Sequence, residues 1–491
     1  MTFDASRAFA DALAQHAAGR LPDAIAVLRT VIARAPRFAP ARNAIGALLL
    51  EAGDATEAIA WLEPLAHHAP HVAAAQVNLG NAYVAARRFD EAIAAYQRAI
   101  AREPNEASNH YALGRAHQLA GDPEAAIHAY RMALSRHDQH VEAWSNLSAA
   151  FNFLDRYVEG VRAAEEALRR APSHAGAHFN RGAALLALGH WSEGWREFAW
   201  RTRTALLGGR TSPSSAPVWD GTARAGETVL VYAEQGFGDT LQFVRYLSLV
   251  RARGLRVVLV CQRPLVRLLH AQQLADVVLP DGAALPPHEV QVSLSSLPEV
   301  LQLHTDAAVV VSDAPYLHIN SARATARYGR PRIGLVWAGH PTHVNDVHRS
   351  LGLAPFAALL ARDDVQWVSL QAGPRTSEIE ALGLTPFFER AARHPRDFAE
   401  TAATVATLDA VVSVDSAVAH LAGAMGVPTW MLLPRIGLDW RWMVGGPPSD
   451  GEASPWYGTV RTLRQHTPHV WDDVMQALSA ALPHATAPRV S

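Results

Sequence analysis

The feature that most constrains this 491-residue sequence is a repeat with a period of 34 residues in its first 200 residues. One position of each repeat carries a small residue, at Gly46, Gly80, Gly114, Ser148 and Gly182. The position twelve residues later carries alanine at Ala58, Ala92 and Ala126, and proline closes repeats at Pro36, Pro70, Pro104 and Pro172. A unit of this length cannot bury its apolar face alone, so neighbouring units must stack and share a continuous core.

The repeat resembles the tetratricopeptide repeat family over about residues 5–200. Residues 78–104 read NLGNAYVAARRFDEAIAAYQRAIAREP, with Tyr83, Phe89, Tyr96 and Ala99 at the positions typical of that family. We therefore expect an α-solenoid at residues 1–203, in which five or six helical hairpins form a right-handed superhelix. The small residues should lie where the two helices of a hairpin touch, and the concave groove should bind a peptide or protein.

Asparagine occurs two positions before the small residue in three repeats, at Asn78, Asn146 and Asn180. This position should face the groove, where each amide offers a donor and an acceptor to the backbone of an extended peptide. The ladder is interrupted, since Ala44 and Ala112 occupy the same position in other repeats. Asparagine is also common here in the family generally, so its presence is equally explained without a bound peptide.

A Gly-, Ser- and Pro-rich segment at residues 204–226 predicts a linker after the repeats. Just before it, Trp191, Trp195 and Trp200 form an apolar stripe. Such a stripe either binds sugar rings or packs one domain against another, and we favour packing.

From residue 227 short β-branched runs alternate with segments of helical periodicity. The runs expected to be strands cover residues 228–233, 256–261, 275–280, 290–296, 332–339, 365–371, 408–415 and 428–434. This alternation predicts parallel sheets, and the break around 312–332 predicts two of them. We expect two Rossmann-type α/β lobes, at 227–325 and 326–491, with ligands at the carboxyl ends of the strands. A last helix at 471–482 is expected to pack back across the lobes.

The loop AEQGFGDT at 233–240 lies between a predicted strand and a predicted helix. Gly236 and Gly238 permit a tight turn there, and Asp239 opens the helix. An acid at this point either caps the helix or projects into the cleft as a general base.

The loop WAGHPTHVNDVHRSL at 337–351 also follows a predicted strand and carries several histidines and Arg349. The histidines have no carboxylate or cysteine partner at a recognised ligand spacing, so we expect no metal site. Gln371 ends a neighbouring strand and either contacts a nucleotide or caps the strand.

The segment VDSAVAHLAGAMGVPTW at 414–430 is the most specific of the three loops. Asp415 ends a strand, Ser416 begins a helix, and His420 lies one turn further on. Free N–H groups and the helix dipole at such a helix start favour a pyrophosphate. The alternative is an ordinary capped helix with a histidine in the core.

These three loops resemble glycosyltransferase family 9, the heptosyltransferase family. The resemblance implies a GT-B fold, with Asp239 as catalytic base in the first lobe. It also implies that Arg349, Asp415, Ser416 and His420 contact the donor, with the guanidinium suited to a diphosphate. The sequence departs from the family pattern by serine for threonine at 416 and by Ala417 where many members have glycine.

The whole chain is similar to bacterial tetratricopeptide proteins fused to such a domain, some of which modify flagellin. This resemblance implies metal-independent transfer of a sugar from a nucleotide-diphosphate sugar, the only co-substrate expected, to a protein recruited by the repeats. Two alternatives are a lipopolysaccharide acceptor and a non-catalytic repeat scaffold on a glycosyltransferase-like fold. The residues do not specify the sugar, the base or the acceptor.

Composition excludes several other classes. The formal net charge of −2 provides no footprint for nucleic acid. A single cysteine, Cys261, excludes a disulfide framework. The N-terminus lacks a basic region followed by an apolar run, and no apolar stretch is long enough to span a bilayer, so we expect a cytoplasmic protein.

Overall fold

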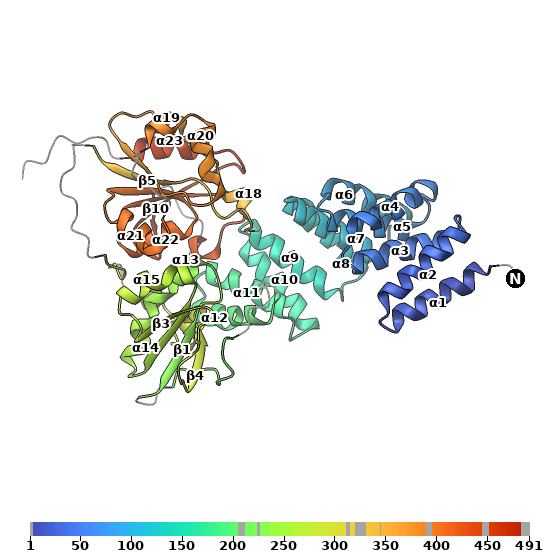
Figure 1. Ribbon diagram of the computed structural model, residues 1–491, viewed down its shortest axis with the longest axis horizontal. Coiled ribbons are helices and arrows are strands. Elements are labelled where there is room, and N and C mark those ends of the chain that lie inside the picture. The colour runs from blue at the N-terminus through green and yellow to red at the C-terminus, as the bar shows by residue number, and fades with distance from the viewer. Residues whose placement is uncertain are drawn as a thin grey trace, which may run out of the picture. The chain divides into compact units, whose positions relative to one another are not determined.

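The computed structural model describes residues 3–204, 212–222, 226–310, 315–319, 330–343, 345–388, 395–443 and 451–482. The chain divides into two compact units, residues 1–177 and residues 178–491 (Figure 1). The division falls inside a helix, so the last helical hairpin belongs to the same unit as the sheets. The predicted lobe boundary at 325/326 lies outside the described residues, as do residues 205–211 and 223–225 of the predicted linker.

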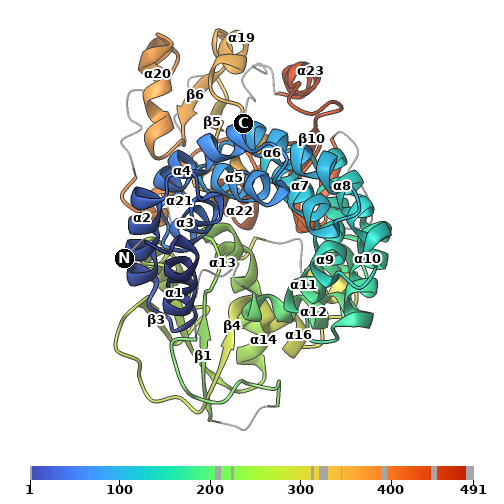
Figure 2. The same ribbon diagram turned by 90° about the vertical axis from the view of Figure 1, so that its right-hand side faces the viewer.

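The first unit is a solenoid of antiparallel helical hairpins arranged in an arc (Figure 2). Its helices are α1 (Ala5–Ala17), α2 (Leu21–Arg34), α3 (Ala39–Glu51), α4 (Ala55–His68), α5 (Ala73–Ala85), α6 (Phe89–Arg102), α7 (Ala107–Ala120), α8 (Pro123–Arg136), α9 (Val141–Phe153) and α10 (Tyr157–Arg170). Pro36, Pro70, Pro104 and Pro172 each lie two residues beyond a helix end, as expected because proline cannot continue a helix. The predicted helical repeats are confirmed.

The small residues of the repeat lie where the two helices of a hairpin meet. A Cβ atom added to Gly114 would come within 2.6 Å of the Tyr130 ring, and one added to Gly80 would come equally close to Tyr96. Both tyrosines are nearly or fully buried. A larger side chain would therefore push the paired helices apart.

We predict that Gly114→Val lowers the unfolding free energy of the first unit by about 1–3 kcal/mol, the usual penalty of overpacking. Chemical denaturation of the full chain measures this change. Ala120→Val is the matched control, because Ala120 is exposed at the end of the same helix. An equal effect of the two substitutions would contradict the assigned contact.

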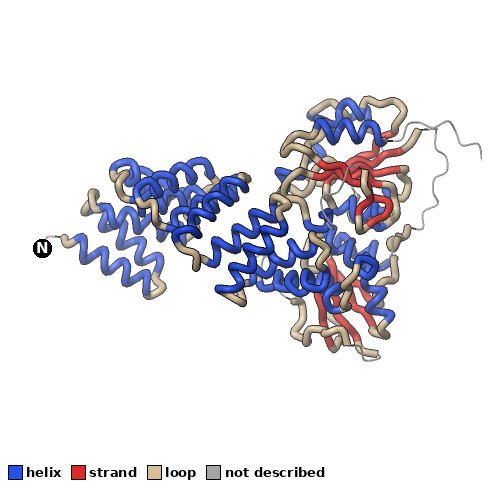
Figure 3. Tube along the Cα trace, turned by 180° about the vertical axis from the view of Figure 1, so that it is seen from behind, coloured by secondary structure: helices blue, strands red, loops and turns tan. Residues whose placement is uncertain are grey.

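The second unit begins with α11 (Ala175–Ala187), α12 (Trp191–Phe198) and the 3₁₀ helix η1 (Ala199–Arg203), followed by two sheets (Figure 3). The first sheet contains β1 (Thr228–Tyr232), β2 (Arg256–Cys261), β3 (Val277–Pro280) and β4 (Val290–Ser293), in the order β3-β2-β1-β4. The second contains β5 (Arg332–Val336), β6 (Gln366–Ser369), β7 (Ala410–Val414), β8 (Thr429–Leu433), β9 (Ala453–Ser454) and β10 (Tyr457–Arg464), in the order β6-β5-β7-β8-β10-β9. Only the β9–β10 pairing is antiparallel among the described strands.

The eight predicted strands are all present, and the prediction of two separate α/β sheets is confirmed. We call residues 226–310 the first lobe and residues 330–482 the second lobe. The helices of the first lobe are α13 (Phe237–Phe243), α14 (Leu247–Ala252), α15 (Arg263–Ala271), α16 (Leu297–Val300) and α17 (Asp306–Val310). Those of the second lobe are α18 (Asp346–Arg349), α19 (Ala357–Leu360), α20 (Glu378–Ala381), α21 (Phe398–Val405), α22 (Ala417–Ala424), the 3₁₀ helix η8 (Trp440–Met443) and α23 (Asp472–Ala481).

The expectation that the last helix crosses both lobes is wrong for the described residues. Val474 and Leu478 of α23 are buried in the core of the second lobe, together with Phe356 and Trp367. The apolar face of this ten-residue helix therefore packs against its own lobe.

The tryptophan stripe packs inside the second unit, as expected for a docking surface. Trp191 donates a hydrogen bond of 2.6 Å to Asp306. Trp195 is 1% exposed, and its ring lies 6.2 Å from Phe243 of the first lobe and 5.4 Å from Trp440 of the second. Helix α12 is thus part of the core that joins the two lobes. Trp200 lies apart from this contact and stacks on His178.

No helix in the described part of the chain is both long enough and apolar enough to span a membrane.

Candidate functional site

The loop after β1 places Asp239 in the first turn of α13, with its two carboxylate oxygens in different roles. Oδ2 accepts a hydrogen bond of 2.9 Å from the Gly236 amide, which holds the turn. Oδ1 faces the second lobe and pairs with Arg441. The helix-cap alternative drawn from the sequence is therefore present, and the role of Asp239 as a general base stays a prediction. Burial raises the pKa of Asp239, and Arg441 partly offsets this rise.

The 3₁₀ helix η8 of the second lobe supplies Arg441. Its Nη1 donates to both oxygens of Asp439, at 2.8 and 2.9 Å. Burial alone would raise the pKa of Asp439, but the neighbouring Arg441 outweighs it and holds the pKa below its ordinary value. Asp439 is therefore the permanent counter-charge of Arg441 within the second lobe.

Helices α13 and α22 pack directly against each other, and Gly238 makes this approach possible. A Cβ atom at residue 238 would lie 2.8 Å from Cδ2 of His420. His420 is 6% exposed, and its Nδ1 lies 2.8 Å from the Tyr457 hydroxyl. Burial lowers the pKa of His420 to about 3, so the imidazole is neutral near pH 7. Any contact that it makes to a phosphate is a hydrogen bond rather than an ion pair.

Asp415 and Ser416 lie at the carboxyl end of β7, as the sequence predicts. Ser416 is the N-cap of α22, and its Oγ lies 2.8 Å from the Ser413 hydroxyl. Burial raises the pKa of Asp415 to about 6, and the positive charge of Arg349 limits the rise. A half-buried carboxyl group, a helix N-terminus and an arginine thus converge at the ends of β5 and β7.

Arg349 is nearly buried and is short of partners. Its side chain is 13% exposed, and its closest charged contact among the described residues is Asp346, 3.8 Å from Nε, which is beyond hydrogen-bond distance. The Nε atom is buried and has no hydrogen-bond partner in the described part of the chain. The guanidinium lies against Gly339, where an added Cβ would meet it at 2.6 Å. A buried guanidinium without an acceptor is unfavourable, so this position fits an anionic ligand.

Gln371 makes only backbone contacts with the residues that the structure describes. Its Oε1 accepts from the amides of Trp337 and Ala338, and its Nε2 donates to the carbonyls of Ala338 and Ala372. These bonds join the ends of β5 and β6, which is the strand-capping alternative. Its contact with a nucleotide stays a prediction.

The groove asparagines are half-buried on the first helices of their hairpins. Asn78 donates to the Asn43 side chain at 2.9 Å, and Asn146 donates to the Tyr111 hydroxyl at 3.2 Å. Each amide nitrogen therefore bonds to the preceding repeat. The peptide-binding role of Asn78, Asn146 and Asn180 stays a prediction.

A buried ion pair between Arg201 and Glu234 holds the start of the loop that carries Asp239. Arg201 of η1 is 1% exposed and contacts Glu234 Oε1 at 2.7 Å through Nη2. The same Nη2 donates to the hydroxyls of Ser293 and Ser296. The end of the helical array is thereby fixed to the residue that begins the EQGFGD loop.

The sequence of residues 438–465, rich in Trp and Arg, favours a segment in which Trp440, Arg441 and Trp442 close over the donor. Nothing in it indicates that Arg441 pairs with Asp239, or that Asp439 and Tyr457 belong to the site. The stretch was not predicted to contain a strand, and the burial of Tyr457–Arg464 does not follow the simple alternation that would have indicated one.

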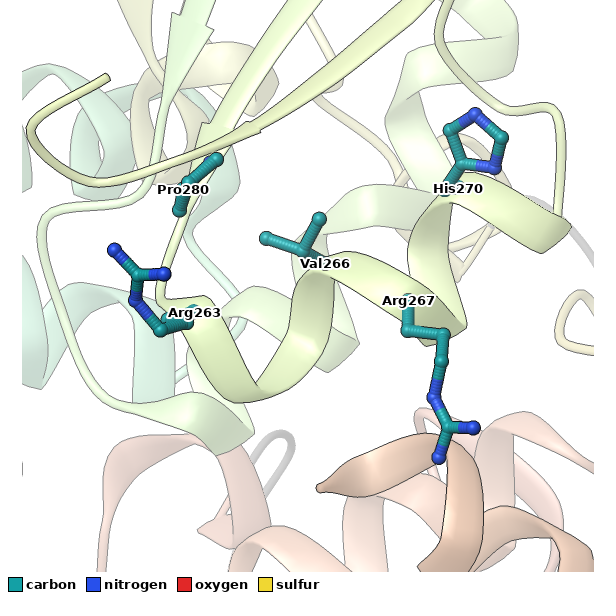
Figure 4. A pocket seen from close by; sticks show the side chains of 5 residues that line it. All are labelled: Arg263, Val266, Arg267, His270 and Pro280. Atoms are coloured by element: carbon teal, nitrogen blue, oxygen red, sulfur yellow. The ribbon is translucent and has the colours of Figure 1, made fainter. Parts of the chain in front are cut away.

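One pocket lies outside the cleft, on the outer face of α15 (Figure 4). It is lined by Arg263, Val266, Arg267, His270 and Pro280. Arg267 points away from it and pairs with Asp397 at 2.7 Å. Asp397 in turn caps α21. None of the predicted donor residues lines this pocket.

We predict that His420 makes the second unit less stable on acidification. Its folded pKa of about 3 is below the ordinary value of 6.5, so the stability that it contributes is present above pH 6.5 and is lost as the pH falls toward 3. At pH 5.5, one unit below the ordinary pKa, the loss is about 1.4 kcal/mol. Asp415 acts in the opposite direction between about pH 4 and 6, because its pKa is raised.

The measurement is the unfolding free energy at pH 7.5 and pH 5.5 for the wild type and for His420→Gln. Asp415 is present in both proteins, so its contribution cancels in the comparison. The variant should lose less stability than the wild type between the two pH values. Equal losses would show that His420 takes up its proton normally in the folded state.

Comparison with known proteins identifies the type of helical repeat in the N-terminal region. Residues 62–107, 77–141, 111–161 and 154–193 match one tetratricopeptide repeat family, and residues 15–79 match another. The N-terminal region therefore consists of tetratricopeptide repeats.

A curated protein, Protein FlbA of Caulobacter vibrioides, is 26% identical over 161 residues, which are 31% of this chain and 25% of FlbA. The chain thus spans about a quarter of the length of this relative. Among solved structures, MamA is 25% identical, with a TM-score of 0.31 over 33% of this chain and 94% of MamA. A thermophilic tetratricopeptide protein of Thermus thermophilus is 21% identical, with a TM-score of 0.32 over 37% and 100%. YrrB, described as a tetratricopeptide protein with an unusual peptide-binding site, is 17% identical, with a TM-score of 0.31 over 36% and 91%.

Proposed function

We propose that the second unit is a GT-B-type glycosyltransferase that moves a sugar from a nucleotide-diphosphate sugar to an acceptor hydroxyl. The observation that carries this proposal is Arg349, a nearly buried guanidinium without a hydrogen bond to any described residue, beside the N-terminus of α22. Arg349 and the free amides of the helix start would bind the donor diphosphate together. The two α/β sheets, with Asp415 and Ser416 directly after β7, agree with a donor site at strand carboxyl ends.

In the proposed reaction, the acceptor oxygen attacks the anomeric carbon while the bond from that carbon to the phosphate oxygen breaks. The electron pair of the broken bond goes to the diphosphate, whose charge Arg349 and the α22 amides stabilise. The proton of the acceptor hydroxyl goes to Asp239, on the opposite side of the cleft. A carboxylate whose pKa is raised by burial is a stronger base than a solvated one, which suits this role.

The repeats would supply the acceptor. Tetratricopeptide arrays typically bind peptides, and the half-buried side chains of Asn78 and Asn146 remain candidates for such contacts. The proposed acceptor is therefore a hydroxyl-bearing protein held by the groove, with flagellin as one candidate.

The first test is binding of UDP, GDP, CDP, ADP and inorganic pyrophosphate to the full chain by calorimetry. We predict that at least one nucleotide binds and that Arg349→Gln weakens it by about 10- to 100-fold, the effect of losing a charged hydrogen bond. Arg263→Gln is the matched control, because this exposed arginine lines the pocket outside the cleft. No nucleotide binding, or equal effects of the two variants, would sink the proposal.

A non-catalytic scaffold is the second candidate. It is favoured by the pairing of Asp239 with Arg441, which engages the carboxylate that is proposed as the base. The scaffold alternative predicts that the wild type binds none of the nucleotides and transfers no sugar. Mass spectrometry of candidate acceptors co-expressed with the full chain distinguishes the two.

A further inference from the structure

A single arginine joins the two sides of the cleft through two carboxylates. Arg441 is 5% exposed and binds Asp439 with Nη1 and Asp239 with Nη2. Asp239 belongs to the first lobe and lies 202 positions earlier in the chain. The acid that the proposed reaction uses as a base is therefore covered by a positive charge from the opposite lobe.

We propose that Arg441 exchanges partners during the reaction cycle: it pairs with Asp239 before the donor binds and turns to the donor diphosphate once that anion binds. This inference rests on the proposed function, and it adds an order of events. The donor binds first, its diphosphate withdraws Arg441, and Asp239 then becomes available to the acceptor hydroxyl.

The surroundings of Arg441 keep the guanidinium near its present position, so only one of its partners has to change. The guanidinium lies 4.9 Å from the Trp440 ring centre and 5.5 Å from that of Phe243. Asp439 holds it from its own loop, so it stays neutralised when Asp239 is released. Its Nε is buried and has no hydrogen-bond partner among the described residues, which leaves a donor for a ligand oxygen.

The charges also favour the exchange. A diphosphate carries at least two negative charges and several acceptor oxygens, whereas Asp239 offers one oxygen to Arg441 and uses the other on Gly236. Burial raises the pKa of Asp239, and Arg441 lowers it by a smaller amount. Withdrawal of Arg441 therefore makes Asp239 a stronger base at the step that needs one.

The test is a double-mutant cycle on the affinity of the full chain for inorganic pyrophosphate, measured by calorimetry with Asp239→Asn and Arg441→Gln. If Asp239 and the anion compete for Arg441, Asp239→Asn should tighten pyrophosphate binding about tenfold in the wild type. Arg441→Gln should weaken binding at least tenfold, and adding Asp239→Asn to it should change the affinity less than twofold. Asp281→Asn, which removes an exposed carboxylate after β3, should change nothing.

An unchanged affinity in Asp239→Asn would overturn the inference. An equal tightening by Asp239→Asn in the Arg441→Gln background would also overturn it, because the effect would then be a general loss of negative charge. If a melting curve shows that Arg441→Gln does not fold, Arg441→Lys replaces it in the cycle with the same criteria. Failure of the wild type to bind pyrophosphate or any nucleoside diphosphate would contradict the proposed function itself. If pyrophosphate binds but the effects of the Asp239 and Arg441 substitutions are independent, only the proposed exchange of partners is contradicted.

Discussion

Asp239→Asn is expected to lower the rate of sugar transfer by roughly 10²- to 10⁴-fold, the range for loss of a general base. Asparagine keeps an oxygen for the Gly236 amide, so the turn before α13 should remain intact. The substitution removes only the negative charge and the ability to accept a proton. The measurement is the initial rate of transfer at saturating donor, with nucleotide binding determined in parallel.

The matched control is Asp281→Asn, which alters an exposed carboxylate after a strand of the same sheet. It should transfer sugar at the wild-type rate. Undiminished turnover in Asp239→Asn would remove this residue from the role of base. Loss of both turnover and nucleotide binding would mean that Asp239 supports the cleft structurally.

The repeat and the sheets were predictable because their causes are local. A 34-residue register of small residues requires close helix contacts, and Gly80 and Gly114 do meet tyrosine rings across a hairpin. Buried parallel strands are continuous apolar runs, so all eight were recognisable. Strand β10 was not predicted, because Tyr457–Arg464 is neither a continuous apolar run nor a regular alternation of buried and exposed residues.

The site was predictable only in part. The spacing of residues along the sequence predicts which helix or strand carries each residue, but it does not predict which helices and strands lie next to each other. The order Asp415, Ser416, His420 fixed their positions at a strand end and a helix start, and the structure has them there. Nothing local to Arg441 indicated a partner 202 positions away. The protonation state of His420 was equally hidden, because its neutral form follows from burial between the first lobe, at Gly238, and its own lobe.

A second large effect is expected at the buried Arg201–Glu234 pair, where Arg201→Met should destabilise the second unit by about 3–5 kcal/mol. Both side chains are almost fully buried, at 2% and 3% exposure, so the substitution removes the guanidinium that offsets the charge of a buried carboxylate. Glu234 begins the loop that ends at Asp239. Amide hydrogen exchange in residues 233–240 should therefore accelerate even where the global fold survives, and transfer should slow with it.

The double variant Arg201→Met/Glu234→Leu distinguishes the cost of an unbalanced buried charge from the stability that the ion pair itself provides. Replacing both partners of a buried ion pair with apolar groups is often neutral or stabilising, so the double variant should recover most of the lost stability. Arg203→Met on the same 3₁₀ helix is the control, because Arg203 is exposed over the Trp200 ring and should contribute less than about 1 kcal/mol. If the double variant is as unstable as Arg201→Met, the serine hydrogen bonds of Arg201 must provide the stability. If it is stable but its loop still exchanges rapidly, the ion pair positions Asp239 in addition to stabilising the unit.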